Sequence, residues 1–150
     1  MVEIPELPAD ILTPDYISIL EQCKSIGHIS VESEENFHLL SQHPLFQQKL
    51  HGLTLDFKIT DIETTFSLLS SPHFWAHMNE LKSLTLKLRD HHDMPNKMRG
   101  YDRIEISLLP LARLKRLITE VTKPYLGAIN ITNIPVSLIE LRCISDSSLV

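Results

Sequence analysis

The chain of 150 residues has only two cysteines, Cys23 and Cys143, and only four glycines. Two cysteines form neither a disulfide framework nor a metal-type cysteine pair, which favours a reduced, intracellular location, cytoplasmic or nuclear. The glycines are not spaced to make a phosphate-cradling loop, so the usual signature of a nucleotide-binding enzyme is missing. The sequence therefore predicts no cofactor.

Long hydrophobic runs are also missing. No apolar stretch approaches the roughly 18 residues that a membrane-spanning helix needs. The first ten residues are acidic and interrupted by prolines, which argues against a secretory signal. With 43% hydrophobic and 22% charged residues, the chain has the composition of one domain with a substantial core.

Basic residues are scarce in the first half of the chain, and charge is unevenly distributed along the rest. Residues 1–80 carry a net charge of −9, residues 81–117 of +5, and residues 118–150 of −1. Solvated faces account for such runs in most proteins. The alternative is a bipolar molecule whose positive middle faces an acidic partner.

Internal repetition is the main positive signal. Residues 37–41 (FHLLS) match residues 66–70 (FSLLS) at an offset of 29, and residues 50–55 (LHGLTL) match residues 81–86 (LKSLTL) at an offset of 31. Looser copies of Leu-x-x-Leu-x-Leu begin at 26, 114 and 138. Residues 106–109 (ISLL), before the fourth copy, echo residues 17–20 (ISIL), before the first. Five copies at a period of this size predict a stacked repeat architecture.

The spacing also predicts alternating strands and helices. Residues 53–57 and 84–88 alternate apolar and polar side chains, which is typical of a half-buried strand. Thr13 followed by Pro14 predicts a capped helix start, Ser71 followed by Pro72 repeats it, and residues 63–70 form a short helix. Residues 89–101 are expected to form a surface loop, and residues 130–135 an extended return. Stacked neighbours would then bury the apolar face of each strand.

The five copies resemble the leucine-rich repeat family, specifically the irregular, ribonuclease-inhibitor-like type found in F-box proteins. The resemblance implies an α/β leucine-rich repeat solenoid of about five repeats, with parallel strands on the concave side and helices or loops on the convex side. Residues 1–13 would be a cap or the end of an earlier repeat, and residues 14–150 the repeat domain, with strands near 26–32, 50–57, 81–88, 114–120 and 138–144.

One position departs from the family pattern. The family has asparagine or cysteine three residues after the last apolar strand position, where this chain has Glu34, Lys58, Arg89, Thr122 and Asp146. We therefore expect the side-chain hydrogen-bond ladder of the family to be missing or replaced.

The alternate strand positions are the candidate site. On a curved repeat they line the concave face, and they are polar with both signs of charge, which suits a protein or peptide partner bound by many modest contacts. No nucleophile lies in a recognisable catalytic motif. The sequence thus predicts a non-catalytic protein-interaction module with these partner-binding residues: His28, Ser30, Glu32, Thr54, Asp56, Lys58, Ser83, Thr85, Lys87, Arg89, Arg116, Glu140 and Arg142, with Ile118 and Glu120 between them.

The resemblance to F-box proteins extends to a short N-terminal segment. Residues 7–12 (LPADIL) are similar to the opening of an F-box. This similarity implies the substrate-recognition repeats of a ubiquitin ligase receptor, whose adaptor would bind through a missing or separate segment. The next thirty residues already contain the first repeat strand and leave no room for the F-box helices, so the favoured interpretation of residues 7–12 is the end of an earlier repeat.

Histidine and basic residues suggest two alternative functions. His73 and His77 have the spacing of a zinc pair but lack an intervening glutamate, and residues 90–93 (DHHD) carry ligand-type groups, so a small α/β enzyme using His73, His91 or Asp93 is an alternative. The basic stretch 82–116 offers nucleic-acid or chromatin binding. Cys23, placed on a helix, and Cys143, placed at a strand core position, are interpreted as packed thiols without a metal role.

Overall fold

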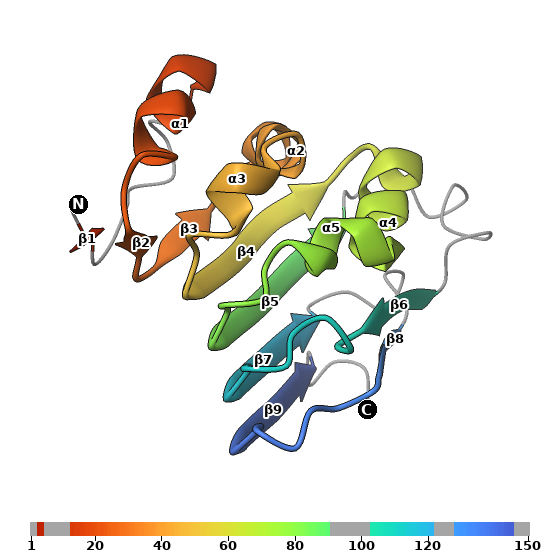
Figure 1. Cartoon of the computed structure of the whole chain (residues 1–150). Helices are drawn as coiled ribbons and strands as arrows, with labels where there is room; N and C mark the ends of the chain where they lie inside the picture. The colour runs from red at the N-terminus through yellow and green to blue at the C-terminus, as the bar shows by residue number, and fades with distance from the viewer. Residues whose placement is uncertain (1–2, 5–12, 91–102, 122–127, 146–150) are drawn as a thin grey trace.

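The computed structural model describes residues 3–4, 13–90, 103–121 and 128–145 (Figure 1). Its elements, in chain order, are β1 (Glu3–Ile4), α1 (Pro14–Leu20), β2 (Ser25–Ile26), β3 (Ile29–Val31), α2 (Glu34–Ser41), α3 (Pro44–Gln47), β4 (Gly52–Ile59), α4 (Ile62–Ser70), α5 (Pro72–Ala76), β5 (Ser83–Asp90), β6 (Arg103–Ser107), β7 (Arg116–Val121), β8 (Ala128–Thr132) and β9 (Glu140–Ser145).

The main sheet has five strands in the order β3-β4-β5-β7-β9, all parallel. Its register aligns the second leucine position of every repeat copy across neighbouring strands, in the series Ile29, Leu53, Leu84, Leu117 and Leu141. The prediction of parallel strands in a mixed α/β fold is confirmed. The described strands form open sheets and no closed barrel.

A second layer covers one face of this sheet. Figure 1 shows α1, α2, α3, α4 and α5 on the same side of the strands. The small parallel sheet of β6 and β8 packs against α4 in this layer. The opposite face of the main sheet carries none of these elements.

Side-chain caps mark the start of α1, α2 and α4, whereas α3 and α5 begin at a proline with no side-chain cap hydrogen bond. The helix start predicted at Pro72 is observed, but the cap predicted from Ser71 is wrong. Thr13 Oγ1 accepts the backbone N–H of Tyr16 at 3.1 Å and Pro14 occupies the first helical turn, as the sequence predicted. Ser33 caps α2 in the same way, 3.1 Å from the Asn36 nitrogen. These caps satisfy N–H groups that have no partner within the helix.

The core lies between the main sheet and the helices. The inward side chains of β4 and β5 are at most 1% exposed. Phe57 of β4 stacks on Phe37 of α2 with ring centroids 5.3 Å apart, and Phe74 of α5 meets Phe37 edge-on at 5.1 Å. Trp75 donates its Nε1 hydrogen to the Leu69 carbonyl oxygen at 2.7 Å. Aromatic pairs of this geometry add packing energy beyond simple area burial.

Two further local expectations are wrong. Residues 106–107 end strand β6, whereas residues 17–20 lie in α1, so the sequence echo between these segments is not structural. Residues 103–107 (RIEIS) alternate polar and apolar side chains, a strand pattern that the four-residue echo concealed. Cys23 is not on a helix, because α1 ends at Leu20; it is a free, half-buried thiol packed against the core.

Candidate binding surface of the main sheet

The alternate residues of the five strands gather on one surface, which we call the open sheet face. Strand pairing places Ser30, Thr54, Thr85, Ile118 and Arg142 in one row across the sheet. Each of these side chains is half-buried or exposed, while the residues between them along β4 and β5 point into the core. The structure therefore places these five side chains, one from each strand, in the same row of the sheet.

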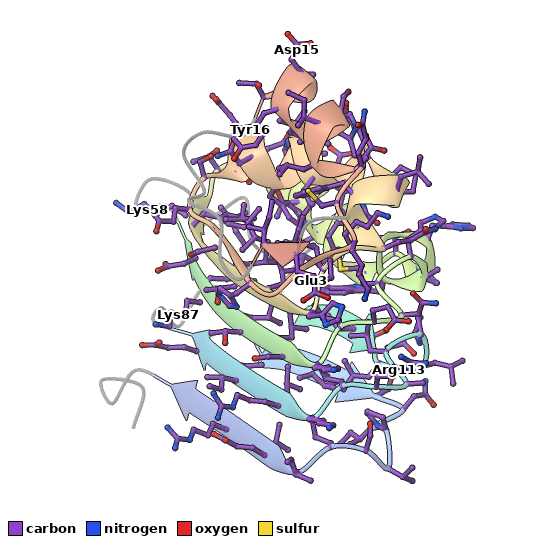
Figure 2. All side chains as sticks on the ribbon, turned by 60° about the vertical axis from the view of Figure 1, so that its left-hand side comes forward. Glu3, Asp15, Tyr16, Lys58, Lys87 and Arg113 are labelled. Carbon is purple, nitrogen blue, oxygen red and sulfur yellow. The ribbon has the colours of Figure 1, made fainter. Side chains whose placement is uncertain are left out.

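Charges of both signs alternate across the next row. Lys87 is exposed and lies in register between Asp56 of β4 and Glu120 of β7. Lys58 lies two residues after Asp56 on the same face of β4. It is in register with Arg89, whose side chain is not among those described. Figure 2 shows Lys58 and Lys87 extending from the same side of the molecule, away from Arg113. Such alternation favours a partner that also carries both signs of charge.

An ion-pair cluster occupies the other end of the face. Glu140 of β9 contacts Arg116 Nε at 3.2 Å and Arg142 Nε at 3.1 Å. Both arginine side chains are more than half exposed, so these pairs contribute little stability and can exchange partners at low cost. One carboxylate shared by two guanidinium groups leaves this corner of the face positive.

A depression of about 330 Å³ lies at the amino ends of β5, β7 and β9. Its lining combines basic side chains with one carboxylate and one exposed isoleucine: Lys82, Ser83, Lys115, Arg116, Ile139 and Glu140. Backbone hydrogen bonds shape its floor, with the Lys115 N–H donating to the Lys82 carbonyl oxygen at 2.8 Å and the Ile139 N–H to the Lys115 carbonyl oxygen at 2.8 Å. This corner can accept an acidic side chain.

His28 is positioned by a glycine that sequence reasoning missed. Its Nε2 lies 3.0 Å from Thr54 Oγ1, and a Cβ on Gly52 would lie 2.6 Å from His28 Nδ1. Only glycine leaves room for the imidazole over β4 at that point. The sequence contained a clue to this close approach, because the neighbouring strands have Ser83, Arg116 and Glu140 at the position of Gly52. The glycine is therefore the exception among the repeat copies.

Glu34, the first of the five positions that depart from the predicted repeat pattern, makes side-chain hydrogen bonds to the next repeat copy. Its carboxylate accepts the backbone N–H groups of Thr60 and Asp61 at 3.1 Å, and the side-chain hydroxyls of Thr60 and Thr65. The turn between β4 and α4 is thereby tied to the start of α2. The same carboxylate borders a depression of about 520 Å³, which is lined by Glu32, Ser33, Glu34, Glu35, Phe57, Lys58 and Thr60.

The alternative sites are only partly described. His73 and His77 are exposed and border a depression of about 190 Å³ beside α3 and α5. Within the described ranges no three His, Cys, Asp or Glu side chains come close enough to hold a metal ion. Residues 91–93 and the F-box-like residues 7–12 lie outside the described part of the chain, as do Lys97 and Arg99 and the side chains of Arg103 and Cys143.

Comparisons with protein-family models, curated proteins and solved structures give no match to this chain. Among the described helices none is long and apolar enough to cross a membrane.

Proposed function

We propose that this chain is a leucine-rich-repeat-type interaction module that binds a protein or peptide on its open sheet face and catalyses no reaction. The observation that carries the proposal is the register of the five parallel strands. It places one leucine or isoleucine of every copy in line and leaves the polar residues between them on the opposite surface. Surfaces built in this way recognise partners through many side chains at once.

The chemistry of the face favours a protein partner. Short hydroxyl side chains, Ser30, Thr54 and Thr85, form a shallow middle row, and charged side chains flank it on both sides. Most of the residues that line the two depressions bordering the face are of polar or charged types. A small-molecule site is usually deeper and more apolar. Protein interfaces, by contrast, have polar rims with charges of both signs.

The resemblance to F-box proteins narrows the proposal. In that class the repeats would hold the substrate of a ubiquitin ligase, and the adaptor would bind elsewhere. The support for this step is the type of repeat and the residues 7–12, which lie outside the described part of the chain. The open sheet face would then be the substrate-binding surface.

The test compares two charge reversals of equal size. The double variant Lys87→Glu/Arg116→Glu changes the open sheet face, and the control Lys24→Glu/Arg113→Glu changes exposed cations elsewhere. Arg116, Lys24 and Arg113 each pair with a glutamate, so both variants also break exposed ion pairs. Interactors captured from cell extracts are identified by quantitative mass spectrometry, and their affinity is then measured with purified proteins.

We expect direct partners whose affinity falls at least about tenfold with the face variant and stays within about threefold of wild type with the control. Circular dichroism should show both variants folded, because the four substituted side chains are exposed. Equal binding by the two variants would remove the open sheet face from the proposal.

Nucleic-acid binding is a second candidate, favoured by one observation. Lys82, Lys115 and Arg116 line the same depression at the amino ends of the strands. Phosphate contacts make affinity fall steeply as salt rises. A steep salt dependence with DNA or RNA, removed by Lys82→Glu/Lys115→Glu, would support this function in place of the first.

A further inference from the structure

The strand β9, at one edge of the main sheet, has an inward leucine that is far more exposed than the matching leucines of β4, β5 and β7. Leu141 occupies the register position of Leu117, Leu84 and Leu53, which are all 0% exposed, yet it is 49% exposed itself. Among the strands that the structure describes, none pairs with this edge, and β9 is the last strand of the sheet (Figure 1). An unpaired edge beside exposed apolar side chains is a template for another strand.

The segment leading into β9 enlarges the apolar surface. Ile139, immediately before the strand, is 83% exposed, and Val136 is fully exposed. Ile134 adds a third side chain at 54%. Of these residues, Ile139 adjoins the strand itself, and exposed apolar side chains at an unpaired strand edge favour association there.

Backbone direction shows which groups of β9 are available. The N–H of Glu140 donates to the Lys115 carbonyl oxygen at 3.0 Å, so Glu140 turns its backbone groups toward β7. Backbone groups alternate in direction along a strand. The N–H and C=O of Leu141 therefore point to the outer edge, where a second strand would find them.

Side-chain charge indicates the partner. On the open sheet face of β9, Glu140 and Arg142 flank Leu141. If a second β9 lies antiparallel with Leu141 opposite Leu141, then Glu140 of each copy faces Arg142 of the other. The same two-fold arrangement brings the free backbone groups of both Leu141 residues together as a hydrogen-bonded pair, with Cα atoms about 5.5 Å apart.

We propose that β9 pairs with β9 of a second copy, antiparallel and centred on Leu141, so that two main sheets join into one continuous sheet. A two-fold contact of this kind uses the same patch on both subunits, as most homodimers do. Leu141 and Ile139 of both copies are covered by the contact, and opposite charges face each other across it. This proposal does not depend on the function proposed for the open sheet face.

The test exploits the symmetry of the charge pairs. Glu140→Arg places arginine opposite arginine in the dimer, and Arg142→Glu places glutamate opposite glutamate, so each single variant repels itself. An equimolar mixture of the two variants restores both attractive pairs. Sedimentation velocity over a range of concentrations, with the complete 150-residue chain, measures the association, and circular dichroism confirms that each variant is folded.

We expect wild type to reach twice its monomer mass of 17.2 kDa. Each single variant should self-associate at least about tenfold more weakly, and the mixture should regain most of the loss. The control Arg113→Glu, which breaks an exposed ion pair with Glu80 elsewhere on the molecule, should dimerise like wild type. A wild-type chain that stays monomeric, single variants that dimerise normally, or a mixture that does not recover would each overturn the proposal.

Discussion

Replacing Glu34 with alanine is expected to loosen the connection between the first two repeat copies. Glu34 stands three residues after the last inward residue of β3, Val31, and its carboxylate accepts hydrogen bonds from Thr60, Asp61 and Thr65. Without it, two backbone N–H groups at the start of α4 lose their side-chain acceptor. The hydroxyl of buried Thr65 keeps only His38, whose Nε2 is 3.0 Å away.

The loss of unfolding free energy depends on whether water can replace Glu34 as the acceptor for each donor. Hydrogen bonds to a charged group contribute about 1.5–3 kcal/mol when they are shielded. Thr60 and Asp61 are exposed, so water replaces much of what their N–H groups lose, whereas Thr65 is 0% exposed. We expect Glu34→Ala to lower the free energy of unfolding by about 2 kcal/mol, which corresponds to a decrease in Tm of about 4–8 °C for a chain of this length.

Urea unfolding followed by circular dichroism measures this loss. The matched control is Glu35→Ala, because Glu35 is exposed and lies in the same first turn of α2. Both substitutions remove the same favourable interaction of a carboxylate with the helix amino end, so their difference isolates the hydrogen bonds. If the two variants lose equal stability, Glu34 does not hold the copies together and the reasoning fails.

Two further pairs of substitutions test the core and the open sheet face. Leu84→Asp should abolish cooperative unfolding because it places an unpaired charge at a position with 0% exposure, whereas Thr85→Asp, next along the strand but on the open sheet face, should leave a folded chain by circular dichroism. Gly52→Ala should lower the urea-unfolding free energy by about 2 kcal/mol through overpacking. Adding His28→Ala should restore only part of this lost unfolding free energy, because the Gly27 carbonyl oxygen would still lie 2.8 Å from the new Cβ. A double variant as stable as wild type would contradict this geometry.

Much of the strand layout was predictable because burial repeats along the chain. Each copy needs a leucine or isoleucine where its strand enters the sheet. The same apolar spacing therefore occurs five times in the sequence. The observed register joins Ile29, Leu53 and Leu84 as the repeat copies predict. The helix start at Thr13 and Pro14 was equally readable, because a cap is a local interaction between residues close in sequence.

Other features were not predictable because they depend on contacts between copies. The pairing of β6 with β8 joins segments separated by twenty residues, and neither strand belongs to one of the five repeat copies. The hydrogen bonds from Thr60 and Asp61 to Glu34 join residues 26 or more positions apart in the sequence. A single sequence does not show which distant donors a carboxylate will meet.

Burial falls at the β9 end of the main sheet, which links stability to association. The inward side chains of β4 and β5 that the structure describes are all apolar and at most 1% exposed, but β7 has the polar Thr119 at its second inward position, and Leu141 of β9 is half exposed. Regions with fewer buried contacts open at lower free energy than the rest of a fold. A contact that covers Leu141 would therefore stabilise the part of the sheet that has the least core of its own, while the open sheet face next to it stays available for a different partner.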